Sequence, residues 1–164
     1  KLNGTISEEK HSELNLNLSI DAYIPDSYAN ESDKIELYQE INSSETREQL
    51  LIVKQKVIDI YGKLPKEVEL LFKKREIDIL SKIAKISSLL EKSTSVELVL
   101  SDEYNKIRGI GNLLFESLLP YISFTKIAYR NKEFRITMNK LPTWVQDLSN
   151  LIEGLYNIIK NNNI

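Results

Sequence analysis

The sequence predicts an α+β fold with a helical N-terminal half and, in the C-terminal half, a small mixed β-sheet with packing helices. Two observations support this class. Between about residues 31 and 87, apolar residues recur at the spacing of amphipathic helices. Between about residues 93 and 160, apolar runs of strand length alternate with two helical segments. We expect a single domain at 13–164, preceded by a polar leader at 1–12.

The N-terminal half opens with an alternating run at Leu14–Ile20, which is the pattern of a half-buried strand. Pro25 ends this strand because proline has no N–H to donate to a ladder. A first helix follows at about Glu31–Ile41, with Ser32 or Asp33 as its cap. The strand can pair with the later sheet, and the sequence leaves this pairing open.

Two longer helices complete this half. The second begins near Ser44 or Glu45 and ends at Gly62, since glycine accepts the left-handed conformation at a helix C-terminus. The third begins at Pro65, where no needed donor is lost, and extends to about Ile86. Its apolar stripe consists of Val68, Leu71, Phe72, Ile79, Ile83 and Ile86.

Shorter elements fill the C-terminal half. Val96–Leu100 predicts a strand, and Gly109–Leu119 predicts a short helix that stops at Pro120. A hairpin is predicted from strands at Phe124–Tyr129 and Phe134–Met138. A closing helix at Thr143–Lys160 has its apolar side formed by Trp144, Leu148, Leu151, Leu155 and Ile159.

Composition excludes several functional classes. With 41% apolar and 28% charged residues and no run of about 20 apolar residues, we expect neither a disordered nor a membrane protein. The absence of cysteine removes disulfides, thiolate metal sites and cysteine nucleophiles, and fits a reducing cytoplasm. A net charge of −2 argues against a dedicated nucleic-acid binder. The chain has no signal peptide or initiator Met, which suggests a piece of a longer protein.

Few residues suggest catalysis. Asp21 and Asp26 flank the proline turn and are a candidate acid–base pair, but a strand end and an Asx turn explain them more simply. The single histidine, His11, lies in the polar leader without companions for a metal site. Gly109 and Gly111 open a helix, but the third glycine of a dinucleotide loop is missing. We therefore expect no enzyme activity, no cofactor and no metal.

The helix at 45–61 suggests an interaction surface. Its buried side is formed by Leu50, Val53, Val57 and Tyr61, extended by Leu51 and Ile58. The opposite side carries one apolar residue among polar ones, and it consists of Glu48, Ile52, Gln55, Lys56 and Asp59. A single exposed isoleucine is common on protein surfaces, whereas an apolar centre with a charged rim is typical of a small interface. The sequence supports both interpretations.

A basic run offers an alternative. The third helix carries Lys66, Lys73, Lys74 and Arg75, with Lys82 and Lys85 further along. These cations are suitable for phosphate contacts, so a DNA-contacting accessory module based on Lys66–Lys85 stays open. Acidic residues are interleaved with them, however, which is the usual pattern of a solvated helix face.

Three motifs resemble one known family. DAYIPDSY at Asp21–Tyr28, KIELYQEI at Lys34–Ile41 and DIYGKLP at Asp59–Pro65 occur in the order and spacing of the C-terminal domain of bacterial transcription-repair coupling factor. The similarity runs from about Gly4 to at least Phe72. The motif residues to which we assign a structural role are Asp21, Tyr23, Pro25, Asp26, Tyr28, Gly62 and Pro65.

The resemblance implies a regulatory role. Its parent would be a cytoplasmic, ATP-dependent DNA translocase that displaces stalled RNA polymerase and recruits excision repair. In that family the C-terminal domain has no catalytic residues. It docks on the N-terminal module of the same protein, covers the surface that binds the excision-repair ATPase UvrA, and so holds the protein in a repressed state.

The same resemblance places the docking contact on the helix at 45–61. Asp59 matches an acidic residue of the family contact. The family arginine that follows is Ile60 here, and the acidic residue three positions before Asp59 is Lys56. The resemblance therefore implies the same docking helix with an altered pattern of charges.

Overall fold

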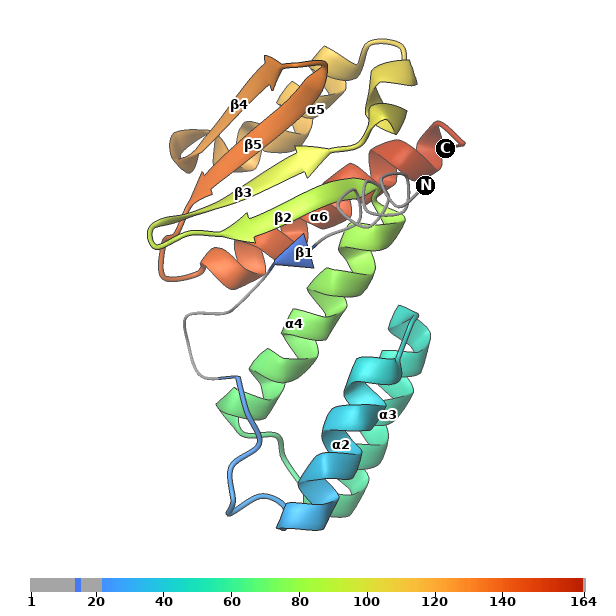
Figure 1. The fold of residues 1–164 in the computed structure, drawn as a ribbon, viewed down its shortest axis with the longest axis vertical. Coiled ribbons are helices and arrows are strands. Elements are labelled where there is room, and N and C mark those ends of the chain that lie inside the picture. The colour runs from blue at the N-terminus through green and yellow to red at the C-terminus, as the bar shows by residue number, and fades with distance from the viewer. Residues whose placement is uncertain (1–13, 16–21, 164) are drawn as a thin grey trace, which may run out of the picture. The chain divides into compact units, whose positions relative to one another are not determined.

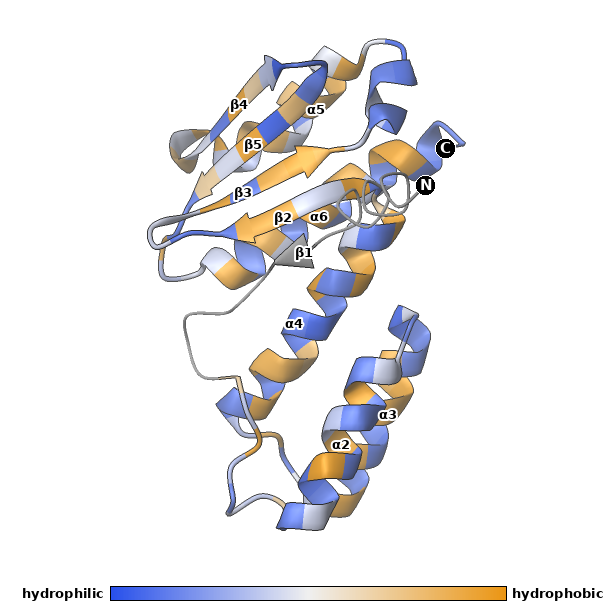
Figure 2. Cartoon of the chain, in the orientation of Figure 1, coloured by the Kyte–Doolittle hydropathy of each residue, from blue (hydrophilic) through white to orange (hydrophobic). Residues whose placement is uncertain are grey.

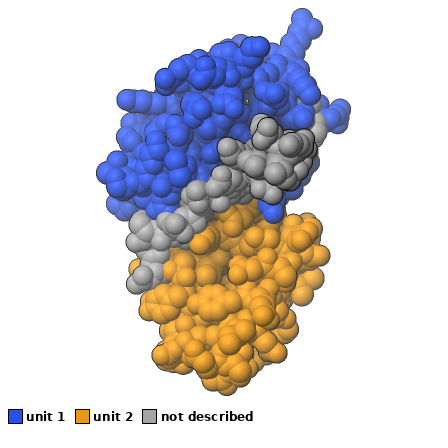
Figure 3. All heavy atoms as spheres, viewed as in Figure 1, with its two compact units in different colours: residues 1–17, 80–164 blue, residues 18–79 orange. Residues whose placement is uncertain are grey.

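The computed structural model describes the backbone of residues 14–15 and all of residues 22–163. It contains two compact units, residues 1–17 with 80–164 and residues 18–79, and the division falls inside helix α4 (Lys66–Ile83) (Figure 3). The polar leader at 1–12, His11 and Asp21 lie outside the described residues. The assignment of 13–164 to one domain stays a prediction.

The helical unit is built from α2 (Glu31–Ser43), α3 (Arg47–Tyr61) and most of α4 (Figure 1). The predicted cap of α2, Ser32 or Asp33, was wrong, whereas α3 begins within three residues of the predicted start at Ser44 or Glu45. The cap of α2 is Asn30, whose side chain accepts a hydrogen bond from the Asp33 amide at 2.8 Å. The cap of α3 is Thr46, because Ser44 is buried and donates its hydroxyl hydrogen back to the Glu40 carbonyl at the end of α2.

The core of this unit joins residues that the helical spacing predicted with residues of the proline turn. Ile24 and Ala29 come from the turn, and Leu64 comes from the segment before α4. The buried residues of the cluster are Ile24, Ala29, Leu37, Ile41, Leu50, Val57, Leu64, Val68, Phe72 and Ile79. Burial of apolar side chains on this scale is the main stabilising term for three short helices.

The other unit contains a mixed sheet, as predicted. Its strands are β1 (Leu14–Asn15), β2 (Ile86–Glu91), β3 (Ser95–Leu100), β4 (Thr125–Arg130) and β5 (Glu133–Asn139). Among the described residues the order is β1-β2-β3-β5-β4, with β1 parallel to β2 and the other pairs antiparallel. Strand β3, in the middle of the sheet, is mostly hydrophobic, and β2 beside it is partly so (Figure 2). The α+β class is confirmed.

Helices α5 (Ile110–Leu118) and α6 (Trp144–Asn161) both lie behind the sheet as it is seen in Figure 1. The predicted apolar side of α6 is buried, and it packs with one face of the sheet in a core that includes Leu89, Leu98, Ile136, Met138, Leu148, Leu151 and Leu155. Two short 3-10 helices, η1 (Asp102–Lys106) and η2 (Leu119–Phe124), connect these elements. Pro120 ends α5 but lies inside η2. No helix of the described residues is long and apolar enough to cross a membrane.

Two boundaries differ from the prediction. Helix α4 ends at Ile83 rather than near Ile86, because Lys85 adopts a positive φ of 60° and turns the chain into β2. Strand β2 was not predicted. Its ladder to β3 shifts register between Ile86 and Ser88, and this irregularity disrupts the apolar alternation that would have indicated a strand.

Candidate docking surface

The docking stripe consists of Glu48, Ile52, Gln55, Lys56 and Asp59 on α3. All five side chains are exposed, as the helical spacing predicted. Ile52, at its centre, has 68% of its surface exposed. Thr46 fixes the start of α3 by accepting from the Gln49 amide at 3.0 Å, and Gly62 ends it with a φ of 92°. Whether the stripe binds a partner stays a prediction.

Helix α2 contributes to this surface, which the sequence analysis missed. Lys56 donates to the Glu40 carboxylate at 2.5 Å, and this hydrogen bond and the charge of Glu40 raise the pKa of Lys56. Ile52 borders a shallow hollow of about 370 Å³ that Glu40 and Ser43 also line. A second hollow of about 420 Å³ lies over Glu36, Gln39, Glu40, Ser43 and Lys56. The spacing of Glu36, Glu40 and Ser43 on one side of α2 was the available signal.

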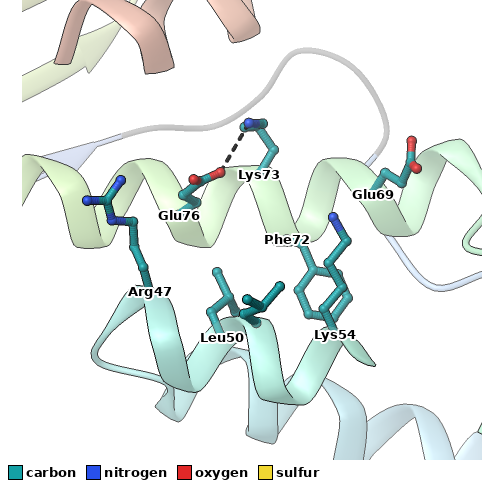
Figure 4. Close-up of a pocket in the computed structure, with 8 residues that line it drawn as sticks. Arg47, Leu50, Lys54, Glu69, Phe72, Lys73 and Glu76 are labelled. Carbon is teal, nitrogen blue, oxygen red and sulfur yellow. Dashed lines mark hydrogen bonds and ion pairs between the residues drawn. The ribbon is translucent and has the colours of Figure 1, made fainter. Parts of the chain in front are cut away.

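The other side of α3 faces α4 across a groove. Figure 4 shows Leu50 and Phe72 between the two helices, with charged side chains around them. The groove has a volume of about 320 Å³ and is lined by Arg47, Leu50, Leu51, Lys54, Glu69, Phe72, Lys73 and Glu76. Its charges have both signs, and Lys73 donates to Glu76 at 3.1 Å. This arrangement suits helix packing with an ion-paired rim better than selection of one charged ligand.

The exposure of Leu51 differs from the prediction for the apolar stripe of α3. It was expected to extend the buried side, but 58% of its surface is exposed at the groove. Ile60, at the position of the family arginine, is also 61% exposed. Helix α3 therefore presents apolar residues to solvent on more than one side.

The proline turn holds the three sequence motifs together within the helical unit. The Tyr28 hydroxyl donates to the Gly62 carbonyl at 2.8 Å, and the ring centroids of Tyr28 and Tyr61 lie 5.5 Å apart. The Ile24 amide donates to the Tyr38 hydroxyl at 2.9 Å. Pro65 accepts from the Val68 and Glu69 amides at the start of α4. Residues of all three motifs thus meet at one place, which local sequence patterns do not show.

The two carboxylates of the enzyme alternative do not form a described pair. Asp21 lies outside the described residues, and Asp26 is an exposed turn residue that accepts from Lys34. That hydrogen bond and the charge of Lys34 lower the pKa of Asp26. Tyr23, on the same turn, is 42% exposed. Within the described part of the chain, no group of His, Cys, Asp and Glu residues could hold a metal ion.

Part of the basic run on α4 is engaged within the helical unit. Arg75 donates from two nitrogens to the Ser44 carbonyl, at 3.0 and 2.9 Å, and lies 3.9 Å from Asp78. Lys73 is paired with Glu76. Arg75 therefore joins α4 to the segment after α2, and Lys73 is paired within α4, which weakens the DNA-binding alternative.

Known proteins match the chain in sequence and in fold. The TRCF domain model matches residues 18–108. A transcription-repair-coupling factor of Staphylococcus haemolyticus is 31% identical over 144 residues, which cover 87% of this chain and 12% of that protein. The corresponding protein of Staphylococcus aureus is 29% identical over 147 residues, covering 89% of this chain and again 12% of the relative. The chain thus spans about an eighth of the length of the curated relatives it matches.

A solved structure gives the same fold. The crystal structure of a C-terminal domain of transcription-repair coupling factor superposes with a TM-score of 0.75 and 21% identity, covering 92% of this chain and 95% of that domain. At this identity the likeness shows the fold, while the TRCF domain model, which matches more than half of the chain, shows the family. The chain therefore belongs to the TRCF domain family, the C-terminal domain of transcription-repair coupling factors.

Proposed function

We propose that this domain is a non-catalytic regulatory module of a cytoplasmic, ATP-dependent DNA translocase that couples transcription to excision repair. The domain docks on the N-terminal module of the same protein through the docking stripe. In the docked state it masks the surface that binds UvrA. UvrA and RNA polymerase are then indirect partners, reached through the parent protein.

The observation that carries the proposal is Ile52, an apolar side chain 68% exposed in the middle of a charged helix face. Glu48, Gln55 and Asp59 surround it on α3, in the pattern of an apolar centre with a polar rim. Glu40 strengthens the correspondence with the family contact. At the position of Lys56 the family carries an acidic residue, and here the Glu40 carboxylate lies beside Lys56.

The modest size of the stripe fits a reversible latch. Closed and open states need to differ by only a few kcal/mol for the minor state to be populated. Exposed ion pairs contribute about 0.2–1 kcal/mol each, and one apolar anchor adds about 1.5–3 kcal/mol when it becomes buried. Such a contact can be released when the motor engages DNA or polymerase, whereas a large apolar interface would stay closed.

The first test is a pull-down of the isolated domain against the remainder of the same protein, with and without ATP. We expect capture of the remainder by the wild-type domain and loss of capture by the Ile52→Glu variant. Leu51→Glu is the matched control, because Leu51 is a neighbouring exposed apolar residue on another side of α3. If the Ile52→Glu variant captured the remainder as well as the Leu51→Glu variant does, the contact would lie elsewhere.

The second test uses the full-length protein. Ile52→Glu combined with Asp59→Arg leaves folding intact, because both side chains are exposed. The double variant should raise ATP turnover in the absence of DNA and increase UvrA binding. A folded double variant with unchanged basal ATPase activity and unchanged UvrA binding would show that the docking stripe is not the latch. The DNA-contacting alternative predicts instead salt-sensitive binding of duplex DNA by the isolated domain.

A further inference from the structure

Strand β4 forms one edge of the sheet and has backbone groups available on its outer side. Strand β4 ends the strand order, and among the described residues it pairs only with β5. Its six residues form a ladder to β5 without a register shift and without proline. Five of them are exposed. Natural edge strands are commonly protected by bulges, proline or charged side chains. Strand β4 has no bulge and no proline, and its charged side chains, Lys126 and Arg130, repel a basic strand but attract an acidic one.

The register shows which backbone groups point outward. The hairpin turn at Asn131 and Lys132 has two positive φ angles, 54° and 65°, so the pair Arg130 and Glu133 closes a two-residue turn. Antiparallel pairs alternate between hydrogen-bonded and non-hydrogen-bonded ones. Counted from the closing pair, Ala128 and Arg130 bond to β5, whereas the N–H and C=O groups of Ile127 and Tyr129 point away from it.

The side chains along this edge have a defined chemistry. Lys126 and Arg130 lie on one face of β4, and Lys132 follows in the turn. These three cations are exposed, and no ion pair to them is found among the described residues. On the other face, Ile127 is 39% exposed and Tyr129 is 57% exposed. A strand added here would meet cations on one face and apolar groups on the other.

We propose that β4 binds an extended acidic segment of a partner protein, which adds to the sheet as a further antiparallel strand. Acidic side chains of that segment lie beside Lys126 and Arg130, and the apolar residues between them cover Ile127 and Tyr129. A second copy of this chain does not fit as well, because it would bring three cations from each chain to one edge. This surface lies in the sheet-containing unit, and the docking stripe lies in the helical unit.

The first experiment measures binding of a labelled peptide by fluorescence anisotropy. The probe has a Glu-Val-Thr-Val-Glu core with blocked termini, and one control peptide replaces both Glu residues by Lys. A second control carries N-methyl groups on both Val residues, which removes the donors that face β4. We expect each control to bind about tenfold more weakly or not at all. Equal binding of the N-methylated and unmodified peptides would overturn strand addition.

The second experiment changes the protein. Lys126→Glu with Arg130→Glu should weaken binding of the acidic peptide about tenfold, since two ion pairs become repulsive. The matched control, Lys63→Glu with Arg108→Glu, makes the same charge change at exposed positions off the edge and should leave binding unchanged. Equal loss in both double variants would show a general charge effect and contradict the proposal.

The third variant tests the outward backbone hydrogen bonds of β4. Ile127→Pro removes an outward N–H and leaves the inward bonds of β4 in place, so the protein should fold and lose the peptide. In the wild-type protein, amide exchange at Ile127 and Tyr129 should slow when the peptide binds, while the inward amides Ala128 and Arg130 stay unchanged. Protection elsewhere would overturn the proposal. Duplex DNA binding that is lost in the Glu variants but kept in Ile127→Pro would make this a phosphate-binding surface instead.

Discussion

At the residue scale, Tyr104 shows how one buried hydroxyl connects elements of the sheet-containing unit. Tyr104 is fully buried in η1, and its hydroxyl donates to the Ala84 carbonyl after α4 and lies 3.4 Å from the Leu155 carbonyl in α6. Burial raises the pKa of this hydroxyl well above its ordinary value of 10.0, so it stays protonated and acts as the donor.

Tyr104→Phe removes that donor and leaves the Ala84 carbonyl buried without it. We expect the free energy of unfolding to fall by about 1–3 kcal/mol, measured by urea denaturation at neutral pH. The same change at the exposed Tyr129 should cost much less. The advantage of the wild type should decline as pH rises above 10, because the unfolded tyrosine then loses its proton before the folded one does. A difference that does not depend on pH there would contradict the role of burial.

Single-residue exposure was predictable from helical spacing, whereas partners distant in sequence were not. The spacing placed Ile52 correctly at the surface, since the period of a helix fixes which residues share a side. It placed Leu51 on the buried side, because the width of the covered stripe depends on where α4 packs. The bonds from Lys56 to Glu40 and from Tyr28 to Gly62 join separate elements, so no local pattern encodes them.

At the element scale, the start of α3 determines which residues the docking stripe presents. Thr46 accepts from the Gln49 amide at 3.0 Å, and the Gln49 side chain accepts from the Glu45 amide at 2.8 Å. This reciprocal arrangement resembles a capping box. Thr46→Ala should lower the free energy of unfolding by about 1 kcal/mol, and Thr46→Ser should restore most of it because serine is a good cap. Equal destabilisation by both changes would exclude the hydroxyl as the cause.

Element types were predicted better than their ends. The hairpin was found because the apolar runs on both sides of the turn alternate regularly. The end of α4 was placed too late because its left-handed residue is Lys85, which carries no glycine or proline signal. Strand β2 was missed because its register shift breaks the alternation. Both errors come from backbone irregularities that tertiary packing sustains.

At the scale of the whole molecule, sheet order and partners lie beyond local patterns. The sequence predicted a small mixed sheet, but the parallel pairing of β1 with β2 joins segments far apart in the chain. The family resemblance placed the predicted docking contact on α3, since three motifs match in order, but it could not show that Glu40 of α2 pairs with Lys56. The pairing of Glu40 with Lys56 changes which charges the docking stripe offers to a partner.

The charges of the docking stripe indicate the charge of the partner surface. With Lys56 paired to Glu40, the acidic residues Glu48 and Asp59 dominate the stripe, so the partner surface should be basic. Raising the salt concentration from about 0.05 to about 0.5 M should weaken docking of the domain on the rest of its protein, because ions screen exposed charge pairs.

Calorimetric titration of the two pieces measures this effect. Asp59→Asn should weaken docking by up to about fivefold, as expected for one exposed ion pair. Lys56→Gln should have a smaller effect, because Glu40 already neutralises that lysine. Glu116→Gln, which makes the same kind of change on α5, is the matched control and should leave docking unchanged. A larger loss with Lys56→Gln than with Asp59→Asn would show that the partner surface is acidic and that the lysine, not the aspartate, makes the principal contact.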